Sequence, residues 1–241
     1  MALMLNIRRR STINITASKP EGTIKLLRVI THLSIILVAM AMVAEGTVLA
    51  RYAWMEDKAD FPSSAPDLPR TGAEFDASIT LVDPWVSKPG VAPRAAALAH
   101  GLASRTDNDD LVEARLVALL AVSPTNGTAW AELARLRFDR EDDMSAVTAA
   151  LETSVATAPL EVDAALTRLQ LCFSAWGLLP EPLRTRIIGY GVRLTGQIDP
   201  EARQTMQAIL EEQPAQIRME ISETLASFGP DGKILKEKLR R

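Results

Sequence analysis

Two hydrophobic patterns divide the chain. A nearly unbroken apolar run covers residues 29–50, whereas from residue 93 onward apolar residues recur every three or four positions between polar ones. The first pattern is typical of a helix that spans a membrane, and the second of amphipathic helices that bury one face. The sequence therefore predicts one transmembrane helix followed by an all-α domain.

Helix signals recur through residues 93–228. Each expected helix begins at or near Asp, Thr, Glu or Pro and stops at Pro, Gly or Asn, which are residues that start and end helices. The connections are short, so successive helices are expected to be antiparallel neighbours. The expected segments are 94–105, 109–124, 128–141, 143–159, 161–180, 181–198, 199–214 and 216–229.

One segment carries the pattern of a helical repeat. Pro124 and Pro159 lie 35 residues apart, and a new amphipathic helix follows each of them. The chain between these prolines resembles a tetratricopeptide-like hairpin, whose period is near 34 residues. The residues that match the family's pattern are Pro124, Trp130, Leu133, Ala134, Ala146 and Pro159.

This resemblance implies a structural role for these residues. Trp130 and Leu133 share one helix face, and the small Ala134 lets the second helix approach closely. The match is firm for residues 125–159 and loose for the hairpins on either side, so a long solenoid is not expected. The expected fold is all-α, with a single N-terminal transmembrane helix followed by an antiparallel helical-hairpin, tetratricopeptide-like domain.

Charge gives the apolar run an expected orientation. Residues 1–28 hold six basic side chains and one acid, which makes this tail +5 and leaves −8 for the rest of a chain of net charge −3. The positive-inside rule then places residues 1–28 in the cytoplasm and the domain on the other side of the membrane. Because the domain is acidic, nucleic acid is not an expected partner.

A cleaved signal peptide is the alternative to an anchor. Ala39-Met40-Ala41 resembles a cleavage site. However, 28 residues are long for the polar lead of a signal peptide, and residues 29–50 exceed a usual apolar region of one. At about 1.5 Å per residue this run covers about 33 Å, which is enough to span a bilayer. We therefore expect an uncleaved inner-membrane anchor.

Two further segments flank the helical domain. Six prolines occur between residues 51 and 93, so residues 51–92 are expected to be an extended tether, with a short docked strand or turn at residues 78–85. Residues 229–241 carry five basic side chains with Ile234, Leu235 and Leu239. A solvated, frayed helix end is expected for this tail, and contact with anionic lipid is the alternative.

The sequence offers little for catalysis or metal binding. Cys172 stands alone within an apolar run and is expected to be a buried small side chain. His32 lies in the apolar run, and His100 has no acidic neighbour at three or four residues along its helix. The acidic clusters at residues 107–110, 139–143 and 211–212 sit at helix starts and loops, where solvation and capping account for them. No catalytic, cofactor or metal site is predicted.

A binding groove remains as the candidate site. The first helices of helical hairpins line a concave face, and the position of Trp130 predicts that Arg135 points into it, with Arg168 as its candidate counterpart in the next repeat. Guanidinium groups there could meet a charged peptide or an acidic sugar polymer. The alternative is two solvated arginines on polar helix faces.

A narrower resemblance suggests a cellular context. The order of anchor, proline-rich segment and helical motifs is similar to small single-pass proteins encoded with bacterial exopolysaccharide synthesis and export systems. The residues that carry this resemblance are Pro124, Trp130, Leu133, Pro159, Arg168, Trp176 and Pro180. It implies an adaptor that binds protein partners in the inner membrane or periplasm. The alternatives are a polysaccharide-modifying enzyme and a subunit of a division or envelope-assembly complex.

Overall fold

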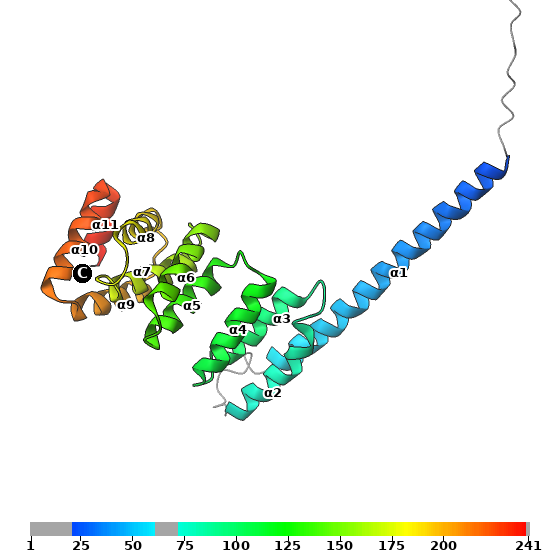
Figure 1. Cartoon of the computed structure of the whole chain (residues 1–241), viewed down its shortest axis with the longest axis horizontal. Coiled ribbons are helices and arrows are strands. Elements are labelled where there is room, and N and C mark those ends of the chain that lie inside the picture. Colours follow the sequence, from blue (N-terminus) through cyan, green and yellow to red (C-terminus); the bar gives the residue numbers. More distant parts are fainter. Residues whose placement is uncertain (1–20, 61–71, 240–241) are drawn as a thin grey trace, which may run out of the picture. The chain divides into compact units, whose positions relative to one another are not determined.

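The computed structural model describes residues 21–60 and 72–239 of the 241-residue chain, and in these ranges every regular element is helical (Figure 1). The chain divides into two compact units, Met1–Ala50 and Arg51–Arg241, which are described separately. The elements are α1 (Glu21–Asp60), α2 (Gly72–Val82), the 3-10 helix η1 (Asp83–Trp85), α3 (Ala92–Ala103), α4 (Asp109–Val122), α5 (Gly127–Asp139), α6 (Met144–Thr157), α7 (Val162–Ser174), α8 (Glu181–Arg193), α9 (Pro200–Glu212), α10 (Ala215–Ser227) and α11 (Gly229–Lys238).

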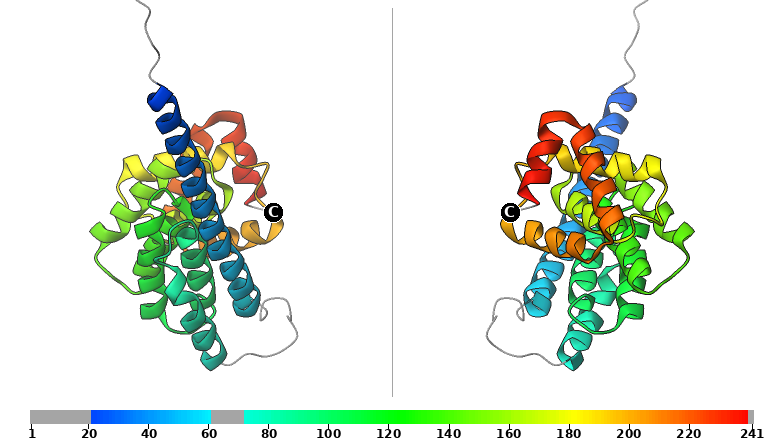
Figure 2. Two further views of the ribbon diagram at one scale, coloured as in Figure 1. Left: turned by 90° about the vertical axis from the view of Figure 1, so that its right-hand side faces the viewer. Right: turned by 90° about the vertical axis from the view of Figure 1, so that its left-hand side faces the viewer.

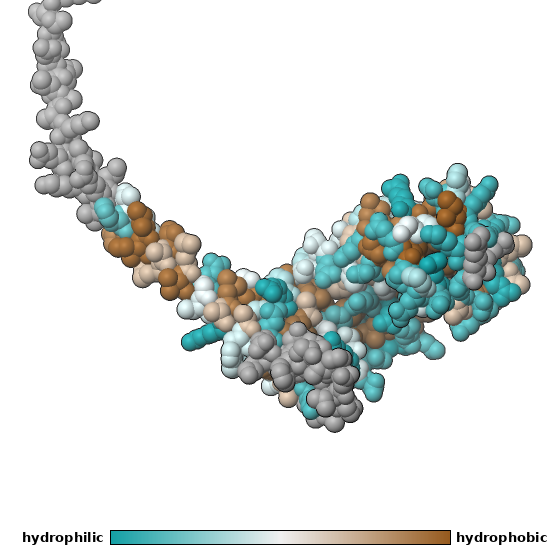
Figure 3. Space-filling view, turned by 180° about the vertical axis from the view of Figure 1, so that it is seen from behind, coloured by the Kyte–Doolittle hydropathy of each residue, from teal (hydrophilic) through white to brown (hydrophobic). Residues whose placement is uncertain are grey.

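The first unit holds most of the long apolar helix. Within α1, residues Ile30–Glu56 are long and apolar enough to cross a membrane, and such a helix is compatible with a single-pass anchor or a signal sequence. Two of its hydroxyl groups bond to the helix's own carbonyls: Ser34 donates to the carbonyl of Ile30 at 2.9 Å, and Thr47 to that of Ala44 at 2.7 Å. These bonds suit lipid, where polar groups must be satisfied internally. Figure 3 shows the described part of this helix as mostly hydrophobic.

The second unit is a series of helices that pack mainly in chain order (Figures 1 and 2). Helix α3 packs on α4, α4 on α5, α5 on α6 and α7, and α7 on α8 and α9. Side chains cap several of these helices. The side-chain oxygens of Asn108, Asn126 and Asp199 accept hydrogen bonds from backbone N–H groups in the first turns of α4, α5 and α9, at 3.0, 3.0 and 2.7 Å. The predicted all-α hairpin architecture is thus confirmed.

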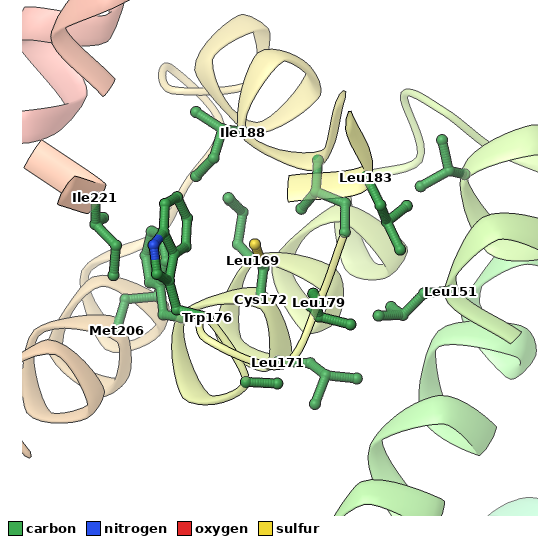
Figure 4. Packing of buried hydrophobic residues seen from close by; sticks show 14 of the residues in the cluster. Leu151, Leu169, Leu171, Cys172, Trp176, Leu179, Leu183, Ile188, Met206 and Ile221 are labelled. Carbon is green, nitrogen blue, oxygen red and sulfur yellow. The ribbon is translucent and has the colours of Figure 1, made fainter. Parts of the chain in front are cut away.

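Two hydrophobic clusters lie in the core of the described part of this unit, and further buried side chains of α1, α2 and α3, such as Tyr52, Val82 and Ala99, lie outside both. The smaller lies mainly between α4 and α5, and the larger extends from α5 to α11. Figure 4 shows part of the larger cluster, in which Leu169, Cys172 and Trp176 pack against Ile188 and Ile221. Trp130 packs against both clusters from α5, so it joins them.

The repeat residues take places consistent with a structural role. Leu133 and Ala134 are buried, whereas Trp130, Ala146 and Pro159 are half-buried and Pro124 is exposed. The indole N–H of Trp130 donates to the carbonyl of Pro124 at 2.9 Å, which ties the start of α5 to its preceding loop. A further close approach lies at Gly127, where an added Cβ would overlap that of Ala158 at the end of α6.

The prediction of an extended tether over residues 51–92 is wrong for the described part of that range. Helix α1 continues to Asp60, and α2 and η1 occupy residues 72–85 in place of the expected strand or turn. Tyr52 and Met55 are each only 1 % exposed, and the ring of Tyr52 meets that of Trp85 edge-on at 5.8 Å. Prolines did not prevent helices here because Pro84 and Pro93 occupy first-turn positions, where a missing N–H costs nothing.

The predicted basic tail at residues 229–241 is also corrected. Residues 229–238 form α11, whose Leu235 is buried together with the following Leu239. The ammonium group of Lys238 donates to the carbonyl of Thr195 at 3.1 Å. Two of the apolar side chains proposed for lipid contact are therefore in the core, and Ile234, which is half exposed, remains at the surface. Arg240 and Arg241 lie outside the described residues.

Candidate partner-binding surface

Arg135 lies on a polar stripe of α5 whose first two residues are half-buried and whose last two are exposed. The stripe consists of Thr128, Glu132, Arg135 and Asp139, which recur every three or four residues and so share a face. Arg135 donates to Asp139 at 3.3 Å, and both side chains are 54 % exposed. An exposed pair of this kind contributes little to stability. The guanidinium group of Arg135 is therefore accessible to a carboxylate of a partner.

A histidine from α3 extends this stripe. The Nε2 atom of His100 lies 2.6 Å from a carboxylate oxygen of Glu132, although the two residues are 32 positions apart. His100 is largely covered, and its buried Nδ1 atom has no hydrogen-bond partner among the described residues. The sequence search missed this pair because it examined only acids three or four positions from His100 along the same helix.

Arg168 does not line a groove, which corrects the sequence-based expectation. Its side chain is 1 % exposed, and its guanidinium group donates to the carbonyls of Ser154, Ala158 and Pro159 at 2.8, 3.0 and 3.1 Å. Burial lowers the pKa of Arg168. The position explains the burial: Arg168 follows Leu133 by 35 residues, the spacing that also separates Pro124 from Pro159. It therefore occupies the core position that Leu133 occupies in the preceding hairpin.

A small cleft beside α8 and α10 brings together residues that the sequence did not connect. The guanidinium group of Arg184 lies over the ring of Trp176 at 4.6 Å and donates to its carbonyl at 2.9 Å. The indole N–H of Trp176 donates to Glu220 at 3.2 Å. Trp176 is only 3 % exposed, so its ring offers no open platform for a ligand. These contacts hold the loop after α7 against α10.

A larger groove of about 420 Å³ opens among α9, α10 and α11. We call it the C-terminal groove. Apolar side chains and charged side chains of both signs line it together. The lining residues are Gln207, Leu210, Glu211, Arg218, Ile221, Ser222, Leu225, Lys236 and Leu239.

Two further acidic side chains act within the fold. Asp143 caps α6, and hydrogen bonds from Ser145 lower the pKa of its exposed carboxylate. Glu113 accepts from Arg137 and Arg140 at 3.1 and 3.0 Å. Within residues 21–60 and 72–239, no group of three or more His, Cys, Asp or Glu side chains is placed to hold a metal ion.

The lone cysteine is part of the core. Cys172 is fully buried, as the sequence predicts, and lies within the larger cluster (Figure 4). Burial raises the pKa of its thiol to about 12. The thiol is therefore protonated near neutral pH and shielded from reagents, which fits a packing role.

Comparison with known proteins gives no family for this chain. No protein-family model, curated protein or solved structure matches it. Its fold is therefore described by its own features: an all-helical chain with packed sequential helix pairs and one N-terminal apolar helix.

Proposed function

We propose that this chain is a membrane-anchored adaptor that acts by binding a protein partner and not by catalysis. The observation that supports this proposal is that one chain combines a helix able to cross a membrane with a series of packed helical hairpins. Helical hairpins packed in series build extended surfaces suited to protein recognition. The polar stripe of α5, with the accessible Arg135, is the proposed contact surface.

The proposed location is the bacterial inner membrane, with the N-terminus in the cytoplasm and the helical domain in the periplasm. The basic residues that precede the apolar run support this orientation. Protease added to spheroplasts would test it. We expect the domain to be degraded without lysis, whereas protection until lysis would reverse the orientation.

The proposed pathway is exopolysaccharide synthesis or export, and it rests on the sequence resemblance carried by Trp130, Trp176 and the neighbouring motifs. In-cell crosslinking of the full chain, followed by affinity purification and mass spectrometry, tests it. Recovery of a polysaccharide polymerase, chain-length regulator or export protein would support the pathway. Recovery of division or protein-assembly components would keep the adaptor role and replace the pathway.

Charge reversal tests the proposed contact surface. Arg135→Glu is expected to weaken recovery of the crosslinked partner, because it places a like charge opposite an acidic group. Arg186→Glu is the matched control: Arg186 pairs with Glu152 at 3.4 Å, with exposures of 50 % and 53 %, but lies on α8. Equal recovery with both variants would remove Arg135 from the interface. Unchanged thermal unfolding would show that neither variant disturbs the fold.

A further inference from the structure

The helices that line the C-terminal groove pack against different neighbours. Helix α9, which lines the groove, packs on α7. Helix α10, which also lines it, packs on α11 and α8. Leu210, Ile221, Leu225 and Leu239 form the apolar part of its lining, and only Leu210 among them is more than slightly exposed. A groove lined by apolar and charged side chains together is suited to binding a protein surface.

Two opposite charges line this groove without pairing. Glu211 on α9 is exposed and Lys236 on α11 is half-buried, and both line the groove. Within residues 30–56 and 74–239, neither side chain makes an ion pair or a hydrogen bond. Arg218, by contrast, donates to the carbonyls of Glu211 and Gln213 at 3.0 and 3.1 Å. The groove therefore offers one anion and one cation whose side chains make no such contact within these ranges, beside Arg218, whose guanidinium group is held by backbone carbonyls.

We infer that the C-terminal groove is a two-fold interface between two copies of this chain. In a two-fold interface the same surface is used on both copies, so that surface must carry both halves of each contact. Glu211 and Lys236 meet this requirement, because Lys236 of one copy pairs with Glu211 of the other and the pair occurs twice. A partner of a single charge sign would leave one of the two groups unpaired.

An exposed apolar side chain beside the groove fits the same arrangement. Met219 on α10 is 57 % exposed and lies one helical turn from the groove residue Ser222. Methionine adapts to irregular apolar surfaces. In the two-fold assembly Met219 of each copy covers apolar surface of the other groove, so each copy supplies both a projecting side chain and a groove.

Sedimentation equilibrium of the full chain in detergent micelles tests this inference. We expect the natural chain to associate as a dimer in a concentration-dependent manner. Lys236→Glu and Glu211→Lys are each expected to raise the dissociation constant by at least about tenfold, because each substitution sets like charges opposite one another. The double variant Lys236→Glu/Glu211→Lys is expected to restore dimerisation, since it re-forms both pairs with reversed polarity.

The controls separate this surface from other routes to association. Arg186→Glu, a charge reversal on α8, should leave the dissociation constant unchanged, and circular dichroism should show the same unfolding temperature for all variants. A monomer at every concentration would overturn the inference and leave the groove to a different protein. A dimer insensitive to both single reversals would also overturn it and point to another interface, such as α1. Failure of the double variant to recover would exclude the Glu211–Lys236 pairing.

Discussion

Arg168 takes over the role of a helix cap at the end of α6. The last carbonyls of a helix have no partners within it, and the C-terminus carries a partial negative charge. The guanidinium group of Arg168 donates to the carbonyl of Ser154 in the last turn of α6 and to those of Ala158 and Pro159 just beyond it. Ser154 in turn donates to the carbonyl of Gly127 at 2.6 Å. One buried cation thereby connects α7 to the end of α6 and, through Ser154, to the start of α5.

Replacing Arg168 should be among the most damaging single changes in the domain. Arg168→Ala removes the donor to the carbonyl of Pro159 and one of the donors to the carbonyls of Ser154 and Ala158, and it leaves a cavity. The lost hydrogen bonds cost about 1–3 kcal/mol and the cavity adds to this loss. We expect the free energy of unfolding to fall by about 3 kcal/mol or more, measured by urea denaturation. Arg186→Ala, at an exposed position, should change it by less than about 0.5 kcal/mol. Similar losses in both variants would contradict the capping role.

At the scale of helices, a close contact between the start of α5 and the end of α6 depends on Gly127. An added Cβ there would overlap that of Ala158, whereas a Cβ at Gly101, inside α3, would meet nothing within 4 Å. Substitution of these two glycines by alanine is therefore expected to change the stability of the domain in opposite directions. Alanine is the better helix former at both positions, but only one of them has space for it.

The two substitutions test this difference by the sign of the change in the free energy of unfolding. Gly101→Ala should raise the free energy of unfolding by about 0.5–1 kcal/mol, because alanine loses less backbone entropy on folding. Gly127→Ala should lower it, because α5 and α6 must separate to admit the methyl group. Thermal unfolding of both variants checks the prediction. Stabilisation by Gly127→Ala would show that α5 and α6 leave room for a methyl group at this position.

The sequence predicted the helices from α3 to α10 because their caps and breakers are local signals. Asn108, Asn126 and Asp199 mark helix starts whatever the rest of the chain does. The extended tether was predicted from the number of prolines, whereas their positions within helical turns decided the structure. Arg168 was assigned to a surface because of its charge, although its spacing of 35 residues from the buried Leu133 pointed to the core. The His100–Glu132 pair and the C-terminal groove depend on contacts distant in sequence, which no local pattern records.

The end of α1 offers a second test at the scale of helices. Tyr52 is buried against Trp85, and the guanidinium group of Arg94 lies 5.8 Å from the centre of its ring, whereas Trp54 on the same helix is 64 % exposed. Tyr52→Ala should destabilise α2 and α3 by about 3 kcal/mol, seen as faster amide hydrogen exchange in both helices. Trp54→Ala should leave that exchange unchanged. Equal effects would contradict the packing of Tyr52.

At the scale of the whole molecule, Trp130 packs against two hydrophobic clusters of the helical domain. In proteins built from stacked helical units, cooperativity depends on the interfaces between neighbouring units. Trp130 supplies part of such an interface and also anchors the loop at Pro124. The two clusters should therefore unfold together only while this contact is intact.

Trp130→Ala should weaken the cooperativity as well as the stability. We expect a loss of about 3 kcal/mol in the free energy of unfolding and a broader urea transition, because the clusters lose a shared side chain. Trp130→Phe keeps an aromatic ring and loses the bond to Pro124, so a loss of about 1 kcal/mol with a single transition is expected. A sharp, unshifted transition in Trp130→Ala would show that the clusters are coupled elsewhere.

The four tryptophans of the chain occupy four different surroundings. Trp54 is largely exposed, Trp85 stacks edge-on against a tyrosine, Trp130 lies between the clusters, and Trp176 is almost fully covered by its neighbours. Their fluorescence should therefore differ in emission wavelength and in quenching by iodide. Variants that retain a single tryptophan would turn these positions into separate optical reporters, from the end of α1 to the loop after α7.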